Sequence, residues 1–184
     1  MQYILASQSP RRKELLARVV ADFQTVPADI DETPYPSEQP IDYVQRMATQ
    51  KAATILKDYP EAMVIGSDTS VICQNQILGK PQDKNDAKSM LEMLSGQTHE
   101  VYTAVSIQSK DKVVNFISKA AVTFYPLTEE EIAQYLLDDE YKDKAGAYAV
   151  QGVASKFIQS IEGNCRSTSS RFVSNLETIL VKKA

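Results

Sequence analysis

Two hydroxyl groups and two guanidinium groups stand close together near the amino end of the chain. Ser7 and Ser9 follow a short apolar run, and Pro10, Arg11 and Arg12 then open an amphipathic helical pattern. Ser9 suits the N-cap of that helix, and Pro10 suits its first position. Backbone N–H groups at a helix start, hydroxyls and arginine forks together predict a phosphate-binding site. A solvated helix start would show the same residues, although arginine there opposes the helix dipole.

Carboxylates occur at two later positions. Asp68 follows the apolar strand pattern 62–66, where we expect a strand to meet a loop. Ligands of α/β sheets bind outside the carboxyl ends of strands, where a carboxylate can activate water or hold a divalent cation. The acidic loop 29–32, which ends in Glu32, offers hard oxygen ligands suited to Mg²⁺ or Mn²⁺. Asp68 also fits a turn aspartate, and the loop also fits a solvated acidic surface.

Two lysines complete the set of candidate residues. Lys51 lies beside the apolar stripe of the helical segment 40–57, and Lys80 lies in a Gly-Lys-Pro turn. Each can hold a phosphate as a compact positive charge, and each also fits an ordinary surface lysine. A Walker A loop is excluded, because Gln74 stands where its first glycine belongs and Pro81 replaces its Ser or Thr.

The elements that must position these groups alternate between strands and helices. The strand patterns cover 2–6, 22–26, 62–66, 71–73, 101–108, 113–124, 145–150 and 157–161, and the helical patterns cover 10–18, 40–57, 83–94, 128–138 and about 170–182. The first half is βαβ-like and the middle is a long hairpin. We therefore predict an α/β fold with a mixed sheet bent across two lobes and a central cleft between them. With no repeat or linker, residues 1–184 are predicted to form a single domain.

Composition narrows the classes of function. Hydrophobic residues make up 43% and charged residues 24%, as in ordinary globular chains. The net charge of -4 argues against general affinity for nucleic acid, so an anionic ligand needs a local basic cluster or a metal. No apolar run approaches the roughly 18 residues of a membrane helix, so we expect no membrane partner. Cys73 and Cys165 form no CxxC, which favours a reduced, cytoplasmic protein. The single histidine, His99, excludes a His-rich metal site.

Taken in this order, the motifs resemble those of the Maf family of nucleoside triphosphate pyrophosphatases. The resemblance covers about residues 2–163. The matching segments are 7–15, 29–32, 43–52, 66–69, 78–81, 94–103 and 144–152. The chain departs from the family pattern at 164–172, where polar residues replace an apolar stretch that ends in a Gly-Leu-Pro turn.

The resemblance implies a fold and a reaction. The fold is an elongated, mixed and strongly twisted sheet flanked by helices, shared with inosine-triphosphate pyrophosphatases, in proteins that are cytoplasmic and often homodimers. The reaction is hydrolysis of dTTP, UTP and modified pyrimidine nucleotides to the monophosphate and pyrophosphate, with Mg²⁺ or Mn²⁺. The residue matching Asp68 is the proton acceptor, and positions matching Arg12, Thr69 and Gln151 are linked to substrate choice. The Asp-Thr pair is similar to that of the dTTP/UTP subgroup.

The predicted site therefore has three parts. Asp68 is the catalytic residue, and Glu32 and Asp68 hold the metal. The substrate-binding residues are Ser7, Arg11, Arg12, Lys51, Thr69, Lys80 and Gln151. A non-catalytic nucleotide-binding regulator of cell division is the alternative, since it would use the same basic residues. The carboxylates distinguish the two, because they repel a nucleotide unless metal and water chemistry need them.

Overall fold

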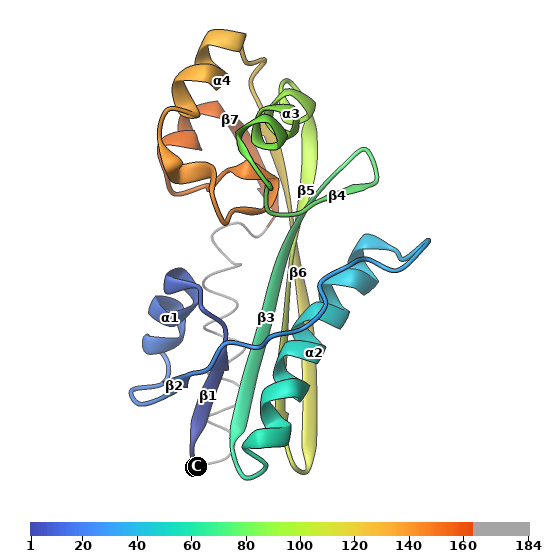
Figure 1. The fold of residues 1–184 in the computed structure, drawn as a ribbon, viewed down its shortest axis with the longest axis vertical. Coiled ribbons are helices and arrows are strands. Elements are labelled where there is room, and N and C mark those ends of the chain that lie inside the picture. Colours follow the sequence, from blue (N-terminus) through green and yellow to red (C-terminus); the bar gives the residue numbers. More distant parts are fainter. Residues whose placement is uncertain (164–184) are drawn as a thin grey trace. The chain divides into compact units, whose positions relative to one another are not determined.

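The computed structural model of this 184-residue chain describes residues 1–163 (Figure 1). These residues divide into two compact units. Unit 1 contains Met1–Asp68 and Thr103–Ser118, and unit 2 contains Thr69–Tyr102 and residues 119–163. Three strands have residues in both units: β3 (Met63–Cys73), β5 (Thr98–Ser109) and β6 (Lys112–Phe124).

Unit 1 places one helix on each face of a short parallel sheet. Strand β1 (Tyr3–Ala6) pairs in parallel with β2 (Gln24–Thr25) and with the first part of β3. Helix α1 (Pro10–Ala17) follows β1, and helix α2 (Pro40–Asp58) precedes β3. Both helices begin with proline at their first position, as predicted for Pro10 of α1.

Alternation along the strands gives unit 1 two apolar cores. Leu5 and Ile65 point to the α1 side, whereas Ile4 and Val64 point to the α2 side, because successive side chains of a strand face opposite ways. The α1 core contains Leu5, Leu16, Val20, Met63, Ile65, Val105 and Ile107, and the α2 core contains Ile4, Ala6, Ala52, Ile55, Ala62 and Val64. This packing fixes both helices against the end of β1, where the candidate phosphate-binding residues begin.

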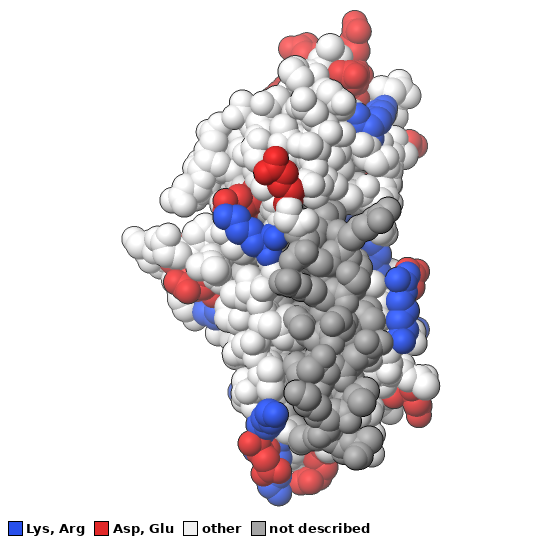
Figure 2. Space-filling view, turned by 180° about the vertical axis from the view of Figure 1, so that it is seen from behind, with Lys and Arg blue, Asp and Glu red and all other residues white. Residues whose placement is uncertain are grey.

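Charges of both signs are intermixed on the surface. On the face drawn in Figure 2, the described Lys and Arg side chains lie among Asp and Glu side chains and do not form one broad basic area. Within residues 1–163, no helix has both the length and the apolar character needed to cross a bilayer.

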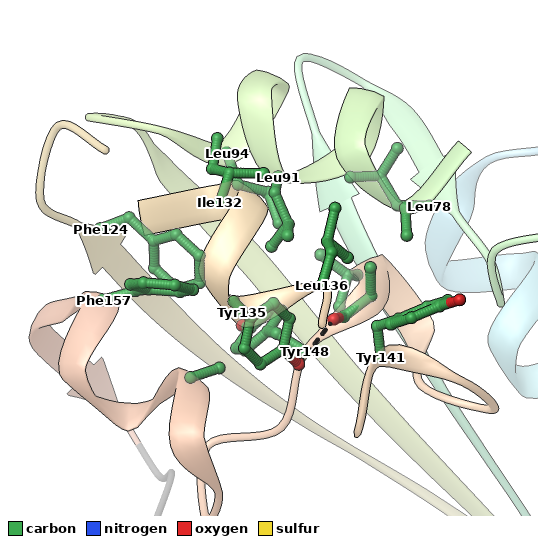
Figure 3. Packing of buried hydrophobic residues seen from close by; sticks show 14 of the residues in the cluster. Leu78, Leu91, Leu94, Phe124, Ile132, Tyr135, Leu136, Tyr141, Tyr148 and Phe157 are labelled. Atoms are coloured by element: carbon green, nitrogen blue, oxygen red, sulfur yellow. Dashed lines mark hydrogen bonds between the residues drawn. The ribbon is translucent and has the colours of Figure 1, made fainter. Parts of the chain in front are cut away.

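Unit 2 is built around an aromatic core. Its further elements are β4 (Gln76–Leu78), α3 (Lys84–Leu94), α4 (Glu129–Tyr135), β7 (Ile158–Gly163) and the 3₁₀ turns η1 (Asp139–Tyr141), η2 (Ala145–Ala147) and η3 (Val153–Phe157). Strand β4 pairs antiparallel with β3, and β7 pairs antiparallel with β6. The buried rings of Phe124, Tyr135 and Phe157 pack with leucines of α3 (Figure 3), and the Tyr135 hydroxyl donates to the Ala147 carbonyl at 3.0 Å.

The helix starts of unit 2 follow from local sequence. Helix α4 begins with a capping box: the Thr128 hydroxyl accepts from the Glu131 N–H, and the Glu131 carboxylate accepts from the Thr128 N–H. Asp83 caps α3 by accepting the N–H groups of Asn85 and Asp86. These caps satisfy backbone donors that a helix start leaves without partners.

Three predicted strands are corrected. Strands 62–66 and 71–73 are one continuous strand, β3, because the polar residues between them, including Ser67, Asp68 and Ser70, are buried and do not form a loop. The segment 145–150 is not a strand. Gly146 and Ala147 both have positive φ, of 66° and 63°, which turns the chain there.

The prediction of a mixed α/β fold with a twisted sheet flanked by helices is confirmed. Along the sheet, hydrogen-bonded neighbours follow the order β2-β1-β3-β5-β6-β7, and β4 pairs with β3. The predicted helix at about 170–182 and the divergent segment 164–172 lie outside the described residues.

Candidate functional site

A buried lysine joins two of the predicted carboxylates. The ammonium Nζ of Lys51, on α2, lies 2.7 Å from Oδ1 of Asp68 and 2.9 Å from Oε1 of Glu32. The side chains of Lys51 and Asp68 are only 10% and 11% exposed, whereas that of Glu32 is 48% exposed. The structure thus brings together three residues, no two of which are closer than 17 positions in the sequence. Removing one member would leave a buried charge without its partner, which is costly.

A glycine sets the distance between the lysine and the aspartate. Gly66 of β3 lies against α2 so closely that an added Cβ would meet the backbone N of Ala52 at 2.7 Å and overlap the Ala48 carbonyl oxygen. Only a residue without a side chain allows this approach. Lys51 precedes Ala52 and Asp68 lies two residues beyond Gly66, so this contact brings their side chains within hydrogen-bonding reach.

The register of the parallel strands brings the amino-terminal motif to the same end of the sheet. Ala6, the last residue of β1, pairs with Gly66 of β3, so Ser7 and Asp68 both lie just past the end of this pairing. Asp68 is therefore inside a strand rather than at its end, which corrects the prediction. It still lies beyond the carboxyl end of the parallel pair, where α/β sheets bind ligands.

Ser7 organises the start of α1. Its Oγ accepts the N–H of Ser9 at 3.1 Å and the Nη1–H of Arg12 at 3.4 Å. Ser9 occupies the predicted N-cap position with extended backbone, but its own side chain makes no capping hydrogen bond. The first turn of α1 contains no acidic residue. The helix start consequently presents donors and positive charge, as an anion site requires.

The arginines differ in their surroundings. Arg11 is exposed and Arg12 is half-buried, and within residues 1–163 neither forms an ion pair. Burial lowers the pKa of Arg12, while the charges of Asp68 and Glu32 act to raise it. Arg12 therefore lies within electrostatic range of the carboxylate pair. The basic motif and the carboxylates of unit 1 form one charged site.

Tyr43 lies beside the same carboxylates. Its pKa is raised to about 12, first by burial and then by the negative charges of Asp68 and Glu32. The phenol consequently stays protonated at neutral pH, and its hydroxyl donates to the Glu32 carbonyl oxygen at 2.9 Å. Sequence reasoning did not single out Tyr43. The available signal was its place on the apolar, buried stripe of the helix that carries Lys51.

Three predicted substrate-binding residues belong to unit 2. Thr69 follows Asp68 in β3 and is half-buried, Gln151 is exposed in the segment before η3, and Lys80 is exposed with Nζ 4.0 Å from Oδ1 of Asp143. Their part in a common site with the residues of unit 1 stays a prediction.

The donor set fits a divalent cation that shares its coordination with a substrate. In the described part of the chain, no group of three or more His, Cys, Asp or Glu side chains is arranged to hold a metal by itself. Asp68 and Glu32 provide two carboxylates that converge on one point, the Lys51 ammonium. Mg²⁺ is commonly bound by one or two carboxylates together with phosphate oxygens. Asp31 has a different role, because its Oδ1 accepts the Thr33 N–H at 2.9 Å and shapes the loop.

His99 has a structural position. It is 1% exposed, its Nε2 lies 2.7 Å from the Tyr148 hydroxyl, and its ring meets Phe124 edge-on. Burial lowers its pKa to about 4, so the ring is neutral at physiological pH. The buried ring bonded to Tyr148 and packed against Phe124 therefore contributes to the core of unit 2.

Comparison with known proteins gives concordant matches. The family model described as Maf-like protein matches residues 2–168. The dTTP/UTP pyrophosphatase of Bacillus cytotoxicus is 47% identical over 163 residues, covering 89% of this chain and 85% of that protein. A protein of the same name from Bacillus anthracis is 46% identical over 173 residues, covering 94% and 91%.

The fold has solved counterparts. The Ham1 protein of Staphylococcus aureus has a TM-score of 0.60 at 12% identity, with full coverage of both chains. Protein VC0702 from Vibrio cholerae has a TM-score of 0.52 at 13% identity, covering 99% of this chain and 96% of that one. At such low identity these two structures show the likeness of fold alone.

Proposed function

Because the chain belongs to the Maf family, we propose that it is an enzyme that hydrolyses dTTP, UTP and modified pyrimidine nucleotides to the monophosphate and pyrophosphate. The observation that carries this proposal is the convergence of Asp68 and Glu32 on Lys51, beside the Ser7–Arg12 helix start. It combines the groups that hold a polyphosphate with a carboxylate that can accept a proton.

Binding of the triphosphate falls to the basic groups. A nucleoside triphosphate carries about four negative charges, and the protein is net acidic, so attraction must be local. Ser7, Arg11 and Arg12 offer donors at the start of α1, and Lys80 adds a further cation in unit 2. Lys51 has three ammonium N–H donors, of which two serve Asp68 and Glu32. The third can donate to a phosphate oxygen.

Asp68 is proposed as the general base. Lys51 holds its Oδ1 at 2.7 Å, which fixes the carboxylate in the site. Asp68 takes a proton from a water molecule, the water oxygen bonds to the α-phosphorus, and the bond from that phosphorus to the α–β bridging oxygen breaks. Pyrophosphate leaves with the bonding electron pair. Asp68 and Glu32 would hold Mg²⁺ or Mn²⁺, which when bound offsets the charge that develops on the phosphates.

Substrate choice is proposed to rest on hydrogen bonds from unit 2. Thr69 and Gln151 offer a hydroxyl and an amide that match the edge of uracil or thymine. A buried amide left unpaired against another base costs about 1–3 kcal/mol, which is enough for useful discrimination. Arg12, next to the phosphate-binding serine, is proposed to contribute to the same choice.

A panel of nucleoside triphosphates tests the proposed function. With Mg²⁺ or Mn²⁺, we expect pyrophosphate and monophosphate from dTTP and UTP faster than from ATP or GTP, and little product after a chelator removes the metal. Tight nucleotide binding with no product would favour the non-catalytic regulator. Release of orthophosphate would indicate a phosphatase instead.

We also propose a homodimer, a cytoplasmic location and one functional domain over residues 1–184, without a membrane or stable nucleic-acid partner. The net charge of -4 and the intermixed charges in Figure 2 support the last point. Sedimentation velocity measures the oligomeric state directly.

A further inference from the structure

The loop that carries Glu32 has little regular structure to hold it. Residues 26–39, between β2 and α2, form neither helix nor strand. The Glu32 side chain is 48% exposed, and its one ion pair within residues 1–163, to Lys51, has Nζ and Oε1 at 2.9 Å. An ion pair with a half-exposed partner contributes only about 0–1 kcal/mol. Other contacts must therefore keep this carboxylate in place.

Arg46 of α2 makes those contacts with one side chain. Its Nε and Nη2 donate to the two carboxylate oxygens of Glu38, both at 2.6 Å, and Nη2 also donates to the Thr33 carbonyl oxygen at 3.0 Å. Its guanidinium lies 3.8 Å from the ring centre of Tyr35. Three residues of the segment 33–38 are thus fixed to α2 directly after Glu32. A planar guanidinium fork suits such a bidentate and stacked contact.

These bonds occupy Arg46. With a weaker bond from Nη1 to Gln50 at 3.4 Å, four of its five N–H donors have acceptors. The bond to Glu38 raises the pKa of Arg46 and lowers that of Glu38, so both groups stay charged. Arg46 is therefore unlike Arg11 and Arg12, which form no ion pair within residues 1–163 and are left to bind an anion.

We infer that Arg46 is a positioning residue: by fixing residues 33–38 to α2, it holds the Glu32 carboxylate next to Lys51 and Asp68. Tyr43 supports the loop from the same helix through its bond to the Glu32 carbonyl. This inference rests on the proposed function for its kinetic consequence, but its structural content, the ordering of the loop, does not.

A double-variant cycle tests whether Arg46 acts through Glu32. In Arg46→Met, which keeps the aliphatic stem, kcat/KM for pyrophosphate release should fall about 10- to 100-fold, the range for partners that orient a metal-ligating group. Glu32→Gln should cause a similar loss, and the double variant should lose little more than Glu32→Gln alone. Losses that multiply would overturn the inference. Lys57→Met removes an exposed cation from the same helix and serves as the control, with unchanged activity.

A second variant separates charge from geometry. Arg46→Lys keeps the positive charge but cannot form the fork to Glu38 together with the Thr33 bond. It should behave like Arg46→Met, and full activity in the lysine variant would overturn the role of the fork.

Hydrogen exchange gives a readout that does not depend on catalysis. The amides of Thr33, Tyr35 and Glu38, which donate hydrogen bonds within the loop, should exchange faster in Arg46→Met than in the wild-type chain, and should stay protected in Glu32→Gln, where the Arg46 contacts remain. Unchanged exchange in Arg46→Met would overturn the inference. If the wild-type chain released no pyrophosphate, the proposed function would fail, and this measurement would still decide whether Arg46 orders the loop.

Discussion

The two units bury polar side chains in different ways. In unit 1, Lys51 and Asp68 form an ion pair with Nζ and Oδ1 at 2.7 Å, and a half-exposed Glu32 is its third member. In unit 2, His99 is neutral, bonded to Tyr148 and surrounded by aromatic rings. A charged cluster with a half-exposed member can be reached by a substrate, whereas a neutral pair within an aromatic core serves packing. Variants in unit 1 should therefore change activity first, and variants of the unit 2 core should change stability first.

Asp68→Asn should show the largest effect. The amide keeps the shape of the carboxylate but cannot accept a proton, so kcat should fall about 10²- to 10⁴-fold, the usual contribution of a general base. The rate of pyrophosphate release measures kcat, and calorimetric titration should show that nucleotide binding is retained. Turnover close to that of the wild-type chain would remove Asp68 from the chemistry and weaken the contrast between the units.

The pH dependence of stability should depend on His99. Its folded pKa of about 4 lies below the ordinary value of 6.5, so between these values the unfolded chain takes up a proton that the folded chain does not. The contribution of the neutral His99 ring to the free energy of unfolding is therefore present above pH 6.5. About 3 kcal/mol of it is lost as the pH falls toward 4. Urea unfolding at several pH values should show this extra loss in the wild-type chain and not in His99→Gln. If the free energy of unfolding changed with pH in the same way in both proteins, the prediction would be wrong.

Gly66→Ala should have a smaller effect, and it should lower both stability and activity. The added methyl group collides with the backbone of α2, so the free energy of unfolding should fall by about 1–3 kcal/mol. The displaced helix should also carry Lys51 away from Asp68 and lower kcat. Gly79→Ala is the matched control for stability, since a Cβ there meets nothing within 4 Å. Equal unfolding midpoints for both variants would show that the close approach is unimportant.

Local signals in the sequence are sufficient to predict the helices of unit 1. Pro10 and Pro40 mark the starts of α1 and α2, and the apolar spacing of 40–57 matches the helix observed. The family resemblance predicts Asp68 and Glu32 together at a metal site, but taken alone Lys51, Asp68 and Glu32 each also fit an ordinary surface or turn residue. Their convergence depends on Gly66, whose close contact with α2 leaves no local signature in the chain.

Other features depend on contacts between distant residues and could not be predicted. The polar run 67–70 looked like a loop, but burial of Ser67 and Ser70 keeps β3 continuous. The alternating segment 145–150 looked like a strand, yet the positive φ angles of Gly146 and Ala147 turn it. The contacts of Arg46 join a helix to a loop eight to thirteen residues away, and the residue types alone do not reveal them.

The lysine between the two carboxylates has a consequence for selectivity and product release. Because two of its three N–H donors already serve Asp68 and Glu32, this ammonium has one donor left for an arriving anion, which the two carboxylates also repel. Chloride or a single orthophosphate should therefore bind weakly, whereas a ligand with several linked phosphates gains contacts elsewhere that offset the repulsion. After cleavage divides those phosphates between two fragments, each fragment loses that advantage, and repulsion by Asp68 and Glu32 favours its departure.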